Sequence, residues 1–280
     1  AYKKIWWDEG SPLIVLSYRL LEKVKNITSI PVALSMRYGN PSIKSGIQEL
    51  VDKGVTEILL IPLYPQHAMA STETILVLAD KIKNEFFPDV HFTNLPAFYN
   101  HKDYIRVLSN SIQSYLNGKE WDHILFSYHG IPERHIRKTD ITKSHCKIDQ
   151  SCCQTKSSAH KYCYRHQCYE TTRQVAEYLE LSEGSYSSSF QSRLAGQPWL
   201  KPYTDKVVEN FAETGTKKMA IVTPAFVSDC LETLEEIAME AKEDFIEKGG
   251  EEFHVVPCLN DDKEWVKTLS RWIDEWANLN

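Results

Sequence analysis

The chain has 280 residues, of which 42% are hydrophobic and 25% charged, with a net charge of −6. This length supports one or two substantial cores and is close to the size at which chains divide into two domains. The acidic balance, without a basic tail or stripe, argues against a nucleic-acid partner. No run of 18 apolar residues occurs and we see no signal peptide, so we expect a cytoplasmic protein without a spanning helix.

Short apolar runs alternate with helical patterns along the chain. Residues 58–61 and 220–222 are continuously apolar, as expected of strands that helices cover on both faces. We predict strands at residues 31–36, 57–63, 91–97, 123–128, 185–190, 218–224 and 253–259. We predict helices at residues 43–53, 71–86, 102–117, 169–181, 205–214, 230–248 and 263–278. Strand–helix alternation of this kind predicts an α/β fold with parallel sheets and helices on both faces.

The two halves of the chain echo each other faintly. Residues 61–64 are followed by Glu73 and residues 223–226 by Glu235 at the same distance. We therefore predict two α/β lobes, residues 1–118 and 119–280, with the boundary near Gly118. Ligands of open α/β sheets bind beyond the carboxyl ends of the strands. The first residues to consider are therefore those that follow the apolar runs, at 37–38, 65–67, 129–130, 191–193 and 226–232.

His129 and Gly130 follow one of these strands directly. A neutral imidazole at a strand end can take a proton near pH 7 or bind a transition metal. It can also simply satisfy the carbonyl group of a turn, and the residues alone leave both readings open.

Glu232, Glu236 and Glu240 are spaced four residues apart, which places them on one face of a helix. A buried row of this kind could relay protons or carry a hydrated divalent cation, whereas an exposed row would be a solvated acidic face. Glu232 lies in the first turn, where the helix dipole favours its ionised form.

Trp199 follows a serine-rich strand and a proline, a composition that fits either the wall of a flat apolar slot or a core position. Glycine-rich dinucleotide and phosphate loops are missing, as is a zinc-protease motif. These absences disfavour a dinucleotide enzyme, a P-loop nucleotidase and a zinc protease.

Five of the seven cysteines fall within 23 residues, in a segment at about residues 137–168. They are Cys146, Cys152, Cys153, Cys163 and Cys168. An odd total in an acidic chain of this size does not suggest a disulfide scaffold, and the spacing matches no zinc-finger pattern. We expect reduced thiols that bind a metal or remain free.

Together these segments resemble the ferrochelatases. The resemblance is carried by Met36-Arg37-Tyr38-Gly39-Asn40-Pro41, by Ser127-Tyr128-His129-Gly130-Ile131-Pro132 and by the run from Pro224 to Leu234. Further matches lie at residues 5–6, 10–13, 62–66, 71–72, 190–193, 198–200 and 203–205. The resemblance implies two Rossmann-like lobes around a porphyrin cleft. It also implies an enzyme that inserts Fe²⁺, its metal substrate, into protoporphyrin IX to form protohaem.

By this resemblance, His129 and Glu232 are the catalytic pair that contacts the iron and the porphyrin centre. Glu236 and Glu240 match the acidic ridge of the family. The residues that match its porphyrin-binding positions are Met36, Arg37, Tyr38 and Trp199. Two pyrrole N–H protons must leave as Fe²⁺ enters, and Fe²⁺ accepts both imidazole and carboxylate ligands.

The chain departs from the family pattern at three places. The opening strand and loop of the family are not matched, so we expect the first lobe to lack its first strand. Cys230 stands where many members have a histidine, which puts a proton-relay role for that position in doubt. The cysteine-rich segment is longer than in simple members.

Some ferrochelatases carry a 2Fe–2S cluster, and four of the five clustered cysteines would suffice to ligate one. Zinc or no metal are the alternatives. For the whole protein, a chelatase that uses coproporphyrin or another divalent metal, or a non-catalytic porphyrin or haem sensor, remains an alternative. Contact with the inner membrane or with an upstream haem-pathway enzyme is plausible because the product is poorly soluble.

Overall fold

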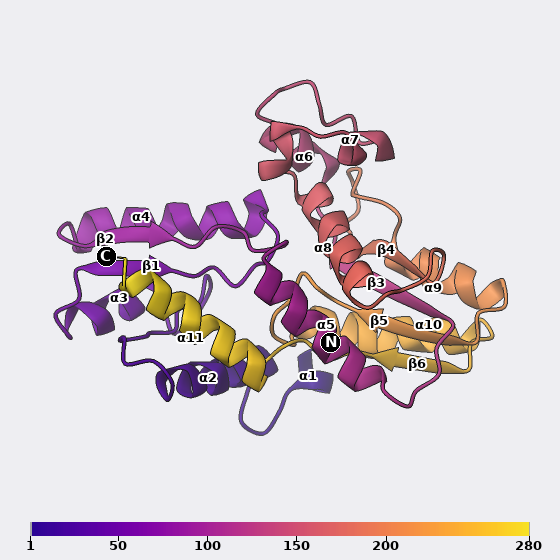
Figure 1. Cartoon of the computed structure of the whole chain (residues 1–280), viewed down its shortest axis with the longest axis horizontal. Helices are drawn as coiled ribbons and strands as arrows, with labels where there is room; N and C mark the ends of the chain where they lie inside the picture. Colours follow the sequence, from indigo (N-terminus) through magenta and orange to yellow (C-terminus); the bar gives the residue numbers. More distant parts are fainter. Residues whose placement is uncertain (1, 280) are drawn as a thin grey trace.

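The computed structural model describes residues 2–279 and contains two parallel β-sheets that lie side by side (Figure 1). The smaller sheet pairs β1 (Glu57–Leu60) with β2 (His91–Asn94). The larger sheet has the order β4-β3-β5-β6. Its strands are β3 (His123–His129), β4 (Tyr186–Gln191), β5 (Lys218–Val222) and β6 (Glu252–Val255). The predicted α/β class with parallel sheets is confirmed.

Strand β3 forms the centre of the larger sheet, and its first six residues are buried. Because side chains alternate along a strand, Leu125 packs with Phe245 on one face, while Ile124 and Phe126 join the core cluster on the other. Helices α8 (Tyr164–Tyr178), α9 (Thr204–Glu213) and α10 (Lys242–Glu247) contact this sheet. The prediction of a sheet covered on both faces is correct here.

The smaller sheet packs against α3 (Ile43–Val51) and α4 (Thr74–Phe86) through a cluster that includes Ile47, Ile58 and Ala79. Helix α3 begins after Ser42, whose side-chain oxygen caps the helix by accepting a hydrogen bond from the Ser45 amide. The strand predicted at residues 31–36 is wrong. This segment forms only one isolated bridge, between Met36 and Ser42, and pairs with neither sheet.

Helices α5 (Lys102–Leu116) and α11 (Lys263–Ala277) connect the regions around the two sheets. Helix α11 packs against both α5 and α2 (Pro12–Lys25). Two further helical segments are short. They are α1 (Tyr2–Ile5), which precedes α2, and the π-helix η1 (Met69–Glu73), which leads into α4. Within the described chain, no helix is both long enough and apolar enough to cross a bilayer.

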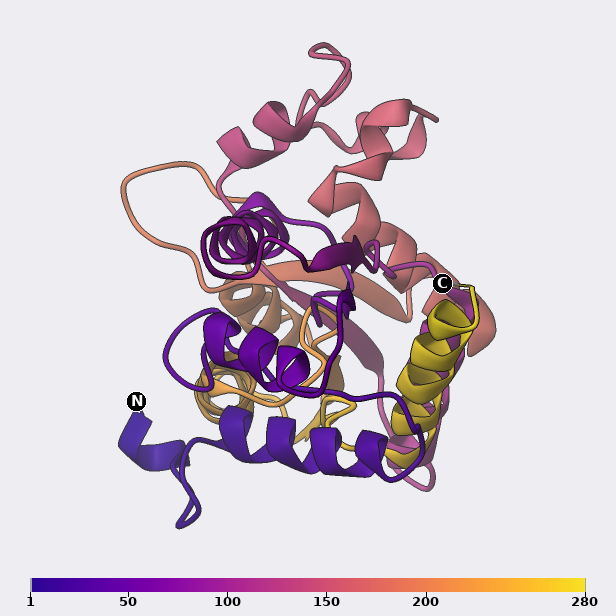
Figure 2. The ribbon, with the colours of Figure 1, turned by 90° about the vertical axis from the view of Figure 1, so that its left-hand side faces the viewer.

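The cysteine-rich insert projects from one end of the molecule in both views (Figure 1, Figure 2). It contains α6 (Glu133–Thr139), α7 (Gln150–Gln154) and the 3₁₀ turn η2 (Ser158–Lys161), and it leads into α8. Helix α8 begins five residues earlier than predicted. The predicted lobe boundary near Gly118 lies between α5 and β3 and stays a prediction.

Candidate functional site

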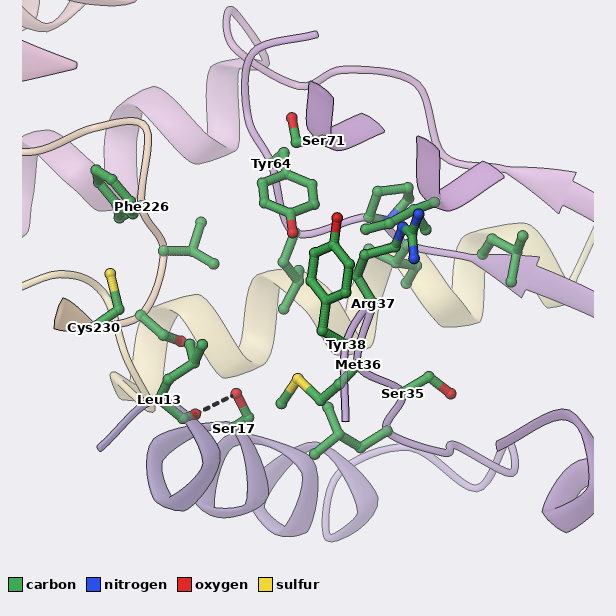
Figure 3. Close-up of a pocket in the computed structure, with 18 of the residues that line it drawn as sticks. Leu13, Ser17, Ser35, Met36, Arg37, Tyr38, Tyr64, Ser71, Phe226 and Cys230 are labelled. Carbon is green, nitrogen blue, oxygen red and sulfur yellow. Dashed lines mark hydrogen bonds between the residues drawn. The ribbon is translucent and has the colours of Figure 1, made fainter. Parts of the chain in front are cut away.

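A cavity of about 1070 Å³ opens between the two sheets, close to the upper end of the range for small-molecule sites. Six of the predicted site residues line it: Met36, Arg37, Tyr38, His129, Trp199 and Glu232. Figure 3 shows Met36, Arg37 and Tyr38 on one side of the cavity and Phe226 and Cys230 on the other. Glu236 and Glu240 are not among the lining residues. The fold therefore brings together residues that are almost 200 positions apart in sequence.

His129 ends β3 at the cavity wall. Its Nδ1 lies 2.6 Å from the Gly130 carbonyl oxygen, and its own carbonyl accepts a hydrogen bond of 2.8 Å from the Tyr164 hydroxyl. Since a carbonyl can only accept, Nδ1 carries a proton in this arrangement, so the lone pair of a neutral imidazole is on Nε2. Nδ1 thus satisfies the carbonyl group of a turn, as one of the two interpretations predicted. Nε2 can still accept a proton or a metal ion.

Glu232 is the first residue of the π-helix η3 (Glu232–Ala241), which follows the loop after β5. The neighbouring Cys230 thiol hydrogen-bonds to Glu232, and burial together with the negative charge of Glu232 raises the pKa of that thiol. Cys230 therefore stays protonated and donates to the carboxylate. It does not replace a histidine as a proton acceptor.

The acidic row leads from the cavity to the surface. Glu232 and Glu236 are half-buried, whereas Glu240 is exposed. Glu236 accepts hydrogen bonds from the Ser192 hydroxyl and from Gln191 Nε2. Partial burial, followed by the charges of the neighbouring acids, raises the pKa of Glu240. The row is neither a fully solvated face nor a fully buried one.

The predicted porphyrin contacts differ in exposure. Tyr38 is 78% exposed, and the Arg37 guanidinium lies 4.6 Å from the centre of its ring. Trp199 is buried and pairs with Pro132 through an isolated bridge. Trp199 thus serves the core and lines the cavity at once, so the two sequence readings do not exclude each other.

Two residues at the site were not among the predicted site residues. Tyr64 lines the cavity, and burial raises the pKa of its hydroxyl, with the nearby Tyr38 adding to the rise. Gln191 lies behind the cavity wall, hydrogen-bonded to both Ser127 and Glu236. Tyr64 follows the apolar strand β1 and Gln191 ends the serine-rich strand β4, positions that mark candidates but do not separate them from their neighbours.

In the insert, the thiols of Cys146 and Cys153 hydrogen-bond to Cys163. The hydrogen bond from Cys153 is the main cause that lowers the pKa of Cys163 to about 6. Cys152 instead donates to the Asp149 carbonyl, and Cys168 is buried beside Tyr164. All seven cysteines are free. Among the described residues, no group of three or more His, Cys, Asp or Glu side chains is arranged to hold a metal ion.

Comparison with solved structures identifies the class of fold. The chain is similar to SirB from Bacillus subtilis with Fe³⁺, with a TM-score of 0.58 at 12% identity over 95% of this chain and 91% of that one. It is equally similar, at 10% identity, to the sirohydrochlorin chelatase SirB from Bacillus subtilis subspecies spizizenii in complex with cobalt. The protein thus has the two-lobed chelatase fold, as predicted.

The sequence comparisons are more specific. The Ferrochelatase family model matches residues 1–277. The ferrochelatase of Pseudomonas fluorescens (strain SBW25) is 46% identical over 272 residues, covering 96% of this chain and 80% of the relative. That of Opitutus terrae is 44% identical over 282 residues, covering 100% of this chain and 81% of the relative. The chain belongs to the ferrochelatase family, and the resemblance seen in its motifs is confirmed.

Proposed function

We propose that this protein is a ferrochelatase that inserts ferrous iron into protoporphyrin IX to form protohaem. Family membership supports the reaction. The observation that carries its assignment to this cavity is that His129 and Glu232, from two different strand-end loops, line the same largely apolar space. An apolar cavity with a few convergent polar groups suits a flat macrocycle whose centre must be reached by a metal ion.

In this proposal His129 and Glu232 divide proton acceptance and iron contact between them. Two protons leave the pyrrole nitrogens and one Fe²⁺ takes their place, so the porphyrin keeps its charge. In the neutral imidazole of His129 the lone pair is on Nε2, because Nδ1 donates its hydrogen to the Gly130 carbonyl oxygen. A carboxylate such as Glu232 suits Fe²⁺ as well as an imidazole does.

In the same proposal, the acidic row forms a path for ions between the cavity and solvent. Glu232 lies at the cavity, Glu236 follows it and Glu240 reaches solvent. Carboxylates in sequence can pass a hydrated divalent cation inward or protons outward. Burial and the neighbouring acids raise the pKa of Glu240, which favours binding of a proton at the outer end of the row.

The porphyrin contacts are proposed at the wall and mouth of the cavity. Trp199 and Met36 offer apolar surface to the macrocycle, and the Arg37 guanidinium offers a charged partner to a porphyrin carboxylate. Tyr38, stacked with Arg37 and exposed, lies where a ligand enters. We place the enzyme in the cytoplasm, with product transfer at the membrane surface or to a neighbouring enzyme of the pathway.

A metal-insertion assay tests the proposal. The protein is supplied with Fe²⁺, Zn²⁺ or Co²⁺ and with either protoporphyrin IX or coproporphyrin, and the product is followed by its absorption. We expect the highest kcat/KM with Fe²⁺ and protoporphyrin IX. Preference for coproporphyrin or cobalt would favour a related chelatase. Tight porphyrin binding without turnover would contradict the enzyme and favour a sensor.

The 2Fe–2S cluster stays a prediction. Three thiols meet at Cys163, one fewer than the four that a cluster requires, and the described donors do not form a metal site. The proposed reaction therefore assigns no step to a cluster. Visible absorption bands in anaerobically purified protein, lost in Cys163→Ser but kept in Cys258→Ser, would establish it. A colourless, iron-free and active protein would exclude it.

A further inference from the structure

Gln191 occupies a central position between the two sides of the site. It is the last residue of β4, is 6% exposed, and pairs in register with His129 of β3. It does not line the cavity. Gln191 therefore cannot act on a bound ligand directly, and its effect must pass through its neighbours.

The side-chain amide uses its hydrogen-bonding capacity on both sides. Its Oε1 accepts a 2.8 Å hydrogen bond from the Ser127 hydroxyl. Its Nε2 donates to the Glu232 carbonyl oxygen at 2.9 Å and to Glu236 Oε2 at 3.2 Å. An amide nitrogen has two hydrogens, so both are used. Gln191 thus fixes the main chain of Glu232 and the carboxylate of Glu236.

The main chain of Gln191 holds the opposite side. Its carbonyl accepts a 2.7 Å hydrogen bond from the Gly130 amide, directly after His129. One residue therefore anchors the loop that carries the imidazole and the helix that carries the carboxylates.

Buried hydroxyls fix which way the amide points. Ser127 is within hydrogen-bonding distance of Thr204 at 2.8 Å, and Thr204 in turn contacts Ser189 at 2.9 Å. Because Ser127 faces Oε1 and the acidic helix faces Nε2, a flipped amide would remove the Gln191 donor from the Glu232 carbonyl and from Glu236, leaving Glu236 only its hydrogen bond from the Ser192 hydroxyl. A flipped amide would also turn its oxygen toward the Glu232 carbonyl oxygen and the Glu236 carboxylate, which are acceptors, so the observed orientation is preferred.

We propose that Gln191 is a positioning residue that sets His129 and Glu232 at their working separation across the porphyrin. The inference rests on the proposed function of that pair. It explains why a glutamine is suited to this place: a carboxylate could not donate to Glu236, and an apolar side chain could bond to neither side.

The test uses Gln191→Met, which keeps the side-chain volume, removes the amide hydrogen bonds and leaves the main-chain bond to Gly130. Misplacement of reacting groups by about 1 Å can cost roughly 100-fold in rate. We expect kcat for Fe²⁺ insertion to fall roughly 10- to 100-fold while KM for protoporphyrin IX and its fluorescence-measured Kd stay within about twofold. Ser127→Ala, which removes only the partner of Oε1, should lower kcat less and offers a milder variant if Gln191→Met folds poorly.

Thr172→Val is the matched control. Thr172 is equally buried, makes hydrogen bonds of 2.8 Å to Tyr128 and 2.9 Å to Ser188, and does not line the cavity. It should lower Tm as Gln191→Met does, yet leave kcat unchanged. The double variant Gln191→Met with Glu236→Gln should lose less than the product of the single losses, because Gln191 acts partly through Glu236.

Three results would overturn the inference: wild-type kcat in a folded Gln191→Met variant, an equal kcat loss in Thr172→Val, or strict additivity together with a parallel rise in KM. A wild-type protein that binds porphyrin but inserts no metal would instead defeat the proposed function, so the two failures are distinguishable.

Discussion

Gly130 leaves no room for a side chain beside the imidazole. A Cβ at this position would lie 2.7 Å from the Gln191 carbonyl oxygen and 3.3 Å from the Trp199 ring. The close approach allows the short hydrogen bond between the Gly130 amide and Gln191. The glycine after His129 is therefore required by the contact between β3 and β4, not by an unusual backbone conformation.

We predict that Gly130→Ala destabilises the protein by about 1–3 kcal/mol, the usual range for an overpacked site. It should also reduce iron insertion, because the disrupted contact between Gly130 and Gln191 holds the chain directly after His129 in place. Urea unfolding and the insertion assay measure the two effects. Gly184→Ala is the control for loss of stability away from the site: its Cβ would meet open space, but its φ of +85° strains an alanine, so it should lower stability and leave insertion unchanged. Equal activity in both variants would show that the close approach is unimportant for the site.

At the residue scale, the sequence identified six of the side chains that line the cavity but not Tyr64, and it included Glu236 and Glu240, which do not line it. Motifs identified His129 and Glu232, and the structure brings both to one space. The supporting partners could not be found in this way. The bond from Tyr164 to the His129 carbonyl and the contacts of Gln191 depend on strand register and helix placement, which no local pattern encodes.

At the scale of elements, the strongly apolar strands were predictable. β3 ends one residue later than predicted and β5 two residues earlier, and both begin at the predicted residue, because their runs are buried on both faces. Helix α2 was not predicted, although Leu16, Leu20 and Val24 are buried along one of its faces. The segment at 31–36 has the composition of a strand but lacks a continuous partner, and strand formation depends on that partner.

The helix predicted at 230–248 is a π-helix over its first ten residues and α-helical only from Lys242. A periodicity of 3.6 residues does not distinguish the two forms in a short segment. The i→i+5 bonding of a π-helix places more residues in each turn, so residues four apart stay close to one face. This geometry keeps Glu232 and Glu236 on the side that faces Gln191.

At the scale of the whole molecule, the lining of the cavity includes the segments that follow β1, β3 and β5, strands that belong to both sheets. His129 follows β3, Glu232 lies beyond β5, and Arg37 and Tyr64 come from the side of the smaller sheet. This arrangement agrees with the rule that α/β proteins bind ligands beyond the carboxyl ends of their strands. It also explains why site residues from distant parts of the sequence could be predicted together.

In the proposed function, His129 serves the reaction and not porphyrin binding. The most direct test of this role compares wild-type protein with His129→Ala in two measurements, protoporphyrin IX binding by fluorescence and Fe²⁺ insertion by absorption. We predict that the variant keeps its Kd for the porphyrin, because the apolar walls remain, and loses insertion. A variant that inserts iron at the wild-type rate would contradict the assigned role of His129.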